Sequence, residues 1–172
     1  IEDGRAIAEK AIELGFGELE LGFHTTQQQV AGFKSMLDRI PVGSVHAFAP
    51  VPLSAPCGYP ELYTLATFDA EARKMAALQV VRNVRFAAEM GADTVVLHAG
   101  RVPCKAWFGR DPMKKRRANG AKLLEAFKPA LAQIVPELEK NGVTLALENL
   151  PYLEGFPAEW EIGDVVGEWV KA

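Results

Sequence analysis

The segment Glu89-Met-Gly-Ala-Asp-Thr-Val-Val-Leu-His98 contains the pattern from which the fold can be predicted. A helical stretch ends there, Gly91 follows, and a short apolar strand begins at once. Two other segments repeat this order, namely Glu13-Leu-Gly-Phe-Gly-Glu-Leu-Glu-Leu21 and Glu139-Lys-Asn-Gly-Val-Thr-Leu-Ala-Leu-Glu148. Glycine adopts the left-handed conformation beyond a helix C-terminus without a Cβ penalty. Each of these glycines therefore predicts the end of a helix with a strand directly after it.

The segments around these strands predict the remaining elements. A fourth strand is expected at 44–48, after the turn Ile40-Pro-Val-Gly43. Apolar residues at helical spacing predict helices over 5–14, 26–38, 69–90, 114–140 and 160–171. Because proline lacks the N–H that a helix interior needs, Pro129 and Pro136 predict that the fourth helix is kinked or split.

Short apolar strands separated by helices indicate parallel βαβ units with right-handed crossovers. The runs Val95-Val96-Leu97 and Leu145-Ala146-Leu147 lack polar alternation, as is typical of a sheet that is covered on both faces. An open doubly wound sheet and a barrel both fit, but no glycine-rich nucleotide-binding motif follows any strand. We therefore predict an α/β chain that forms a TIM (β/α) barrel of parallel strands with outer helices, in one domain over 1–172.

Composition excludes several classes of function. The formal net charge of −3 and a pI near 5.7 argue against nucleic acid as a partner, which calls for a basic stripe. No apolar run approaches the roughly 20 residues that span a bilayer, and no signal peptide is recognisable at Ile1. Cys57 and Cys104 stand in no metal or redox motif. These features predict a cytoplasmic protein with reduced thiols.

All three histidines fall in or just after the predicted strands: His24, His46 and His98. The strand over 143–148 closes with Glu148. In (β/α) barrels the C-terminal strand ends form the active-site face, and imidazole and carboxylate ligands suit Zn, Mn or Co. A lone strand-end histidine is more often a hydrogen-bonded polar group, which is our interpretation of His24. His46 fits both roles equally, whereas His98 and Glu148 on adjacent strands favour a functional site.

Four short segments resemble strands of a known family. Leu97-His98-Ala99-Gly100 and Leu147-Glu148-Asn149 resemble the fourth and fifth strands of xylose-isomerase-like barrels. Glu18-Leu-Glu20-Leu is similar to the second strand and Ser44-Val-His46 to the third. This superfamily contains sugar and sugar-phosphate isomerases and epimerases, and also zinc-dependent abasic-site endonucleases (AP endonuclease family 2). The resemblance covers almost the whole chain, from about strand 2 to helix 5.

Carried over residue by residue, the resemblance makes Glu148 a metal ligand in either branch and a catalytic base in the isomerases. It makes His98 and His46 metal ligands in the endonuclease branch. In many isomerases they would instead lie near the substrate or behind the metal ligands. Glu20 would face the pocket floor or the substrate.

The chain also departs from the family. It opens in the helix after the first strand and stops in the helix after the fifth, whereas a full barrel takes about 250 residues. The family's ligands on the sixth, seventh and eighth strands have no counterpart. We therefore expect a partial barrel, either a truncated chain or a half-barrel that a partner completes, because four strands alone leave two open edges.

The function that the resemblance implies is a divalent-metal-dependent isomerase or epimerase of a sugar, sugar phosphate or related hydroxy-carbonyl compound. One cation (Mn, Co, Mg or Zn) would act as a Lewis acid, and carboxylates would move a proton through an enediolate. A sugar or keto acid is the expected partner, and a homo-oligomer is an open alternative.

Substrate-binding groups are expected on the strands and in the loops beyond them: Glu20, Arg101, Asn149 and Trp107. Arg101 stands nearest a strand end among several cations of its loop and suits a phosphate or carboxylate. Phe23, Phe48, Trp107 and Phe108 are candidates for shielding the site, although ordinary packing is the commoner role of each. The proline-rich stretch over 49–60 is interpreted as an ordered active-site loop or lid.

Two other functions remain open at this point. A zinc-dependent abasic-site endonuclease, similar to endonuclease IV, is favoured by the histidines at 46 and 98 and opposed by the acidic balance. A non-catalytic sugar-binding barrel is the third class.

Overall fold

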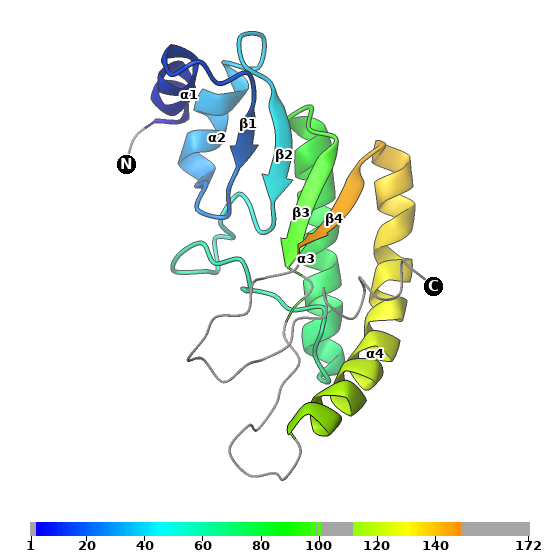
Figure 1. The fold of residues 1–172 in the computed structure, drawn as a ribbon. Helices are drawn as coiled ribbons and strands as arrows, with labels where there is room; N and C mark the ends of the chain where they lie inside the picture. The colour runs from blue at the N-terminus through cyan, green and yellow to red at the C-terminus, as the bar shows by residue number, and fades with distance from the viewer. Residues whose placement is uncertain (1–2, 99, 101–111, 149–172) are drawn as a thin grey trace.

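The protein was analysed as a computed structural model, which describes residues 3–98, 100 and 112–148. Helices and strands alternate strictly along the described chain (Figure 1). In order they are α1 (Gly4–Glu13), β1 (Leu19–Leu21), α2 (Gln27–Lys34), β2 (Val42–His46), α3 (Ala70–Glu89), β3 (Thr94–His98), α4 (Pro112–Asn141) and β4 (Thr144–Glu148). No helix in the described part is long and apolar enough to cross a membrane.

The four strands form one parallel sheet in the order β1-β2-β3-β4. Each strand therefore pairs with the next one along the chain, and one helix provides each crossover. Val95 of β3 pairs with Val45 of β2 and with Leu145 of β4, which fixes the register across the middle of the sheet. All four strands consequently run the same way, and their C-terminal ends meet at one edge (Figure 1).

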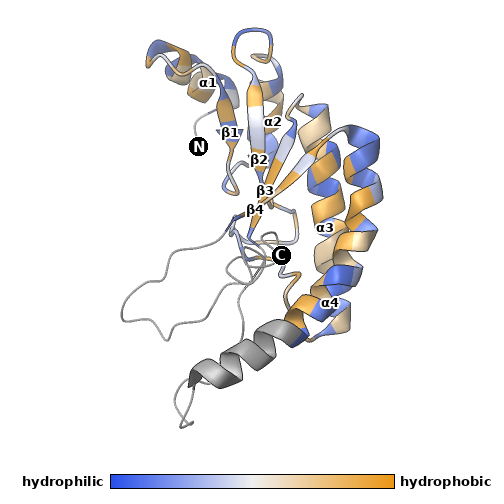
Figure 2. Cartoon of the chain, turned by 45° about the vertical axis from the view of Figure 1, so that its right-hand side comes forward, coloured by the Kyte–Doolittle hydropathy of each residue, from blue (hydrophilic) through white to orange (hydrophobic). Residues whose placement is uncertain are grey.

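The two faces of the sheet differ in burial. Leu21, Val45, Val95 and Leu97 are buried on the face that packs against the helices. Figure 2 shows α3 and α4 side by side along this face. On the opposite face Ser44, Val96 and Ala146 are only half-buried. Within the described residues, the apolar strands are thus covered by helices on one face, while the face that a closed barrel would enclose is partly open.

Local signals explain where the helices begin and end. Thr26 and Gln29 form a capping box at the start of α2. The Asp69 carboxylate accepts the backbone N–H groups of Glu71 and Ala72 at 2.9 and 3.0 Å, which satisfies two donors at the start of α3. Glycines with positive φ follow α1, α3 and α4: Gly15, Gly91 and Gly142. The prediction that the glycine-strand phrase marks helix ends is therefore confirmed.

Three elements differ from those expected. α2 ends at Lys34, whereas the helix was expected to continue to residue 38. β2 covers Val42–His46 rather than 44–48, so His46 closes its strand instead of lying within it. α4 continues through Pro129 and Pro136 as one helix rather than splitting (Figure 1). Both prolines are exposed, so the carbonyls that lose a helical hydrogen bond can be hydrated. The helix expected over 160–171 lies outside the described residues.

α3 and α4 are joined by an ion pair between Arg85 and Glu137. The Arg85 guanidinium donates through Nε and Nη2 to the two carboxylate oxygens of Glu137, each at 2.9 Å. The Asn141 side-chain amide donates to the same carboxylate at 3.0 Å. The hydrogen bond from Arg85 has the largest effect on the Glu137 carboxylate, followed by that from Asn141. Both stabilise its charged form and lower the pKa of Glu137 to about 2.

This pKa predicts how the α3–α4 contact responds to acid. Because the folded pKa lies below the ordinary glutamate value, the contribution of the pair to stability is present above that ordinary value. It is lost as the pH falls toward 2. Carboxyl ¹³C NMR should show Glu137 titrating near 2 and moving back toward the ordinary value in Arg85→Met. If the pKa of Glu137 in the wild-type protein equals the ordinary glutamate value, the ion pair does not form in solution.

Candidate metal centre

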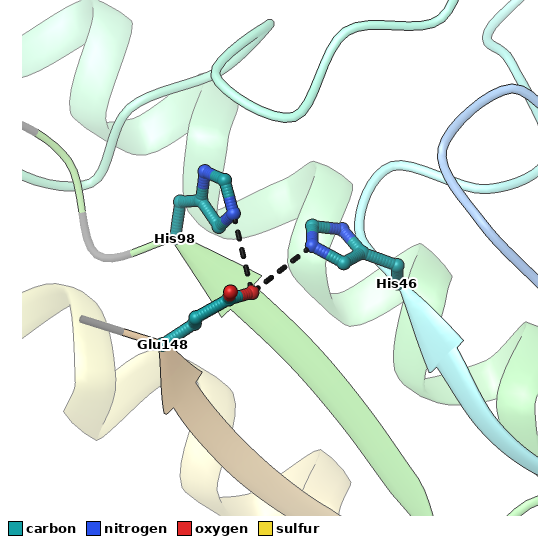
Figure 3. A group of neighbouring side chains, drawn as sticks. All are labelled: His46, His98 and Glu148. Carbon is teal, nitrogen blue, oxygen red and sulfur yellow. Dashed lines mark ion pairs between the residues drawn. The ribbon is translucent and has the colours of Figure 1, made fainter. Parts of the chain in front are cut away.

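Three neighbouring strands end in side chains that converge on one point (Figure 3). His46 closes β2, His98 closes β3 and Glu148 closes β4. His98 pairs directly with Glu148, and His46 pairs with Val96, two residues before His98. Since successive strand residues alternate between faces, this register puts all three side chains on the same face. One ligand atom from each lies within 4.8 Å of the others.

The Nε2 atoms of the two imidazoles lie near the same carboxylate oxygen. His46 Nε2 lies 3.4 Å and His98 Nε2 lies 3.3 Å from Glu148 Oε2. These distances exceed the roughly 2.7–2.9 Å of a good hydrogen bond between charged groups. They match the spacing of about 3.3 Å between two ligand atoms of a tetrahedral zinc with bonds of about 2.0–2.1 Å. The spacing of these donor atoms therefore fits a shared cation better than a direct hydrogen bond.

The second nitrogen of each buried imidazole has its own partner. His46 Nδ1 lies 2.7 Å from the carbonyl oxygen of Ala47, to which an Nδ1–H can donate. His98 Nδ1 lies 3.2 Å from Glu61 Oε1. With Nδ1 engaged in both rings, Nε2 carries the lone pair that a metal needs. Two imidazoles and one carboxylate are a recognised zinc donor set that keeps a position open for a further ligand.

Burial differs across the cluster in a way that suits a site open on one side. Both histidines are buried, whereas the Glu148 side chain is 43% exposed. The Phe23 ring, from the segment after β1, meets the His46 ring edge-on at a centroid distance of 5.2 Å. Gly58 holds this segment close, because a Cβ there would lie 1.8 Å from the Phe23 carbonyl oxygen. The segment after β2 and Phe23 thus form a wall beside His46.

The other expected site residues divide into three groups. Glu20 lies on the same face of the sheet as the cluster. It pairs with Ser44, two residues before His46, and accepts a hydrogen bond from Ser44 Oγ at 2.5 Å. His24 is exposed and is not part of the cluster, so it lies apart from the candidate metal ligands. Arg101, Trp107 and Asn149 lie outside the described residues.

Two aromatic residues that were grouped as candidate shields have different surroundings. Phe23 contacts His46, as described above. Phe48 is instead buried in the core, with its ring 5.1 Å from that of Tyr63. It also lines a hollow of about 400 Å³ between the segment after β2 and α3, which shares no residue with the cluster. The role of Phe48 is therefore ordinary packing, as the sequence had favoured for any single aromatic.

Glu61 is a neighbour of the site that the sequence did not reveal. It lies in the irregular segment between β2 and α3, and its carboxylate is mostly buried beside His98. Because Glu61 lies outside any helix or strand, the sequence spacing between Glu61 and His98 could not predict their contact.

Several solved structures have a fold similar to that of this chain. A D-tagatose 3-epimerase-like protein is 23% identical with a TM-score of 0.59, over 86% of this chain and 49% of that one. An L-ribulose 3-epimerase is 14% identical with a TM-score of 0.60, over 99% and 54% of the two chains. The TTHB071 protein from Thermus thermophilus, solved with ZnCl2 soaking, is 26% identical with a TM-score of 0.52, over 83% and 52%. The chain thus spans about half the length of the solved structures that it matches.

Sequence comparison with curated proteins gives no match. A family comparison does, and it covers residues 8–168 under the description xylose isomerase-like TIM barrel. The parallel strands alternating with helices form part of such a barrel, which confirms both the expected fold and the resemblance. The chain belongs to the xylose isomerase-like TIM barrel family.

Proposed function

We propose that this protein is a divalent-metal-dependent isomerase or epimerase acting on a sugar, a sugar phosphate or a related hydroxy-carbonyl compound. The observation that carries the proposal is the convergence of His46, His98 and Glu148 at the C-terminal strand ends. The sugar epimerases among the similar structures support the reaction class. A small-molecule substrate, a cytoplasmic location and a single domain over 1–172 are parts of the same proposal.

In this proposal His46 and His98 would hold the cation through Nε2, and Glu148 would hold it through Oε2. When bound, the metal acts as a Lewis acid that polarises the substrate carbonyl. Glu148 has a second oxygen, Oε1, and its side chain is accessible from the open face. In this proposal Oε1 takes the proton from the carbon beside the carbonyl, and epimerisation needs a second acid on the opposite side of the substrate to return a proton to that carbon.

The surroundings supply orientation and exclude water. Phe23 covers one side of His46, and the segment over 49–60 packs against the Phe23 segment, with Val51 N–H donating to the Thr25 carbonyl at 2.8 Å. Glu20, held by Ser44, forms part of the floor. Arg101, Trp107 and Asn149 are proposed substrate contacts on the strength of the sequence alone.

The two-histidine donor set also favours a second candidate, a zinc-dependent abasic-site endonuclease. In that enzyme the metal would generate the hydroxide that attacks a phosphodiester. The net charge of −3 argues against it, because DNA binding depends on neutralising phosphates. Cleavage of an abasic-site oligonucleotide by the purified full-length protein would move this candidate to first place.

Metal content tests the donor set directly. Elemental analysis of the folded full-length protein should find about one divalent ion per chain, because three protein ligands with an open position form a single site. The ion should be lost in Glu148→Gln and retained in Glu139→Gln, whose parent is an exposed glutamate near the end of α4. A folded wild-type protein without metal, or equal metal in both variants, would contradict the proposal.

Isotope exchange tests the chemistry. In D2O with D-tagatose or D-fructose, ¹H NMR should show loss of the proton on the carbon beside the carbonyl. Since a positioned general base contributes about 10²–10⁴-fold, exchange should slow by at least about 10²-fold in Glu148→Gln. Sugar binding without exchange by the metal-loaded protein would instead identify a non-catalytic binding barrel.

A further inference from the structure

A mostly buried carboxylate, that of Glu61, lies against His98 beside the candidate metal centre. Glu61 Oε1 lies 3.2 Å from His98 Nδ1, and the two side chains are 14% and 8% exposed. A carboxylate placed there without a donor would carry a substantial desolvation cost. Its position against an imidazole N–H is therefore a specific arrangement and not a chance surface contact.

The segment that carries Glu61 is anchored. Leu65 and Ala66 are buried in the core, and Tyr63 packs edge-on against Phe48. The chain that leaves β3 passes close to this segment. At Gly100, where φ is +110°, a Cβ would meet Thr64 Cγ2 at 2.3 Å and Ala66 Cβ at 2.9 Å. The segment directly after Glu61 is thus packed against Phe48 and close to Gly100, which fixes the position of the backbone that carries Glu61.

The two histidines of the cluster are oriented by different means. His46 Nδ1 faces the backbone carbonyl of its own neighbour, Ala47, which no side-chain substitution removes. His98 Nδ1 faces a side chain that is distant in sequence. A carboxylate that accepts Nδ1–H fixes the tautomer, directs the Nε2 lone pair outward and raises the basicity of the ligand. The orientation of His98 therefore depends on a side chain, which a single substitution can remove.

We propose that Glu61 is a positioning residue that holds His98 in its Nδ1–H tautomer with Nε2 directed at Glu148, and so strengthens metal binding. The inference rests on the proposed metal site, but its first consequence is visible in the metal-free protein. Glu61 does not itself touch the metal in this proposal. It acts through His98 in the way that carboxylates behind zinc-bound histidines act elsewhere.

The test uses two variants and two readouts on the full-length protein. Glu61→Ala removes the acceptor, whereas Glu61→Gln keeps an amide oxygen that can still accept from Nδ1–H. Glu13→Ala, at an exposed glutamate on α1, is the control. Two-bond ¹H–¹⁵N NMR spectra of the imidazoles report the His98 tautomer without metal. Competition with a chromogenic chelator then gives the Zn²⁺ affinity.

The expected result is a wild-type His98 in the Nδ1–H tautomer, with Glu61→Ala shifting it toward Nε2–H and weakening Zn²⁺ binding about 10–100-fold. Glu61→Gln should keep most of the wild-type Nδ1–H tautomer and most of the Zn²⁺ affinity. Glu13→Ala should change neither property. An unchanged tautomer and unchanged affinity in a folded Glu61→Ala would overturn the inference. A wild-type protein that binds no Zn²⁺ but shows the tautomer shift would overturn the metal function and leave the positioning contact standing.

Discussion

The hydrogen-bonded register of β2, β3 and β4 is the constraint on which the rest of the site depends. Parallel pairing aligns the C-terminal ends of the three strands, and the pairs His98–Glu148 and His46–Val96 set the height of each side chain. A shift of one residue in any of these strands would turn its ligand toward the helices. The buried face of Val45, Val95 and Leu97 prevents such a shift, because it would bring polar groups into the core. Packing on one face of the sheet thus fixes chemistry on the other.

Burial then determines what the histidines can do. A buried imidazole needs a partner for its N–H, and in both rings Nδ1 meets an acceptor close to where the strand ends. The Nε2 atoms are left facing Glu148, at distances typical of ligands around a common cation. The carboxylate of Glu148 is half-exposed and is therefore accessible from the open face of the sheet. The site therefore combines buried imidazoles with an accessible carboxylate, and this arrangement follows from the register and burial of one sheet.

The sequence predicted the parts of this arrangement that periodicity controls. Gly15, Gly91 and Gly142 located the helix ends, and the apolar runs before His98 and Glu148 located two strand ends, because local sterics and burial act over a few residues. His46 stayed undecided, since its strand was expected two residues later and its role depends on its neighbours across the sheet. Glu61 was missed because its contact with His98 is made through an irregular loop. Of the two alternatives for α4, a split helix was wrong, because both prolines face solvent and the helix continues through them.

The measurement that tests the account most directly is X-ray absorption at the zinc edge of the Zn²⁺-loaded full-length protein. The account predicts two imidazole nitrogens and carboxylate oxygen at about 2.0–2.1 Å. The imidazole signal should fall by half in a His98→Ala variant that still binds zinc. A zinc surrounded by oxygen alone, or one whose imidazole signal is unchanged in both His46→Ala and His98→Ala, would contradict the claim that these strand ends form the metal centre.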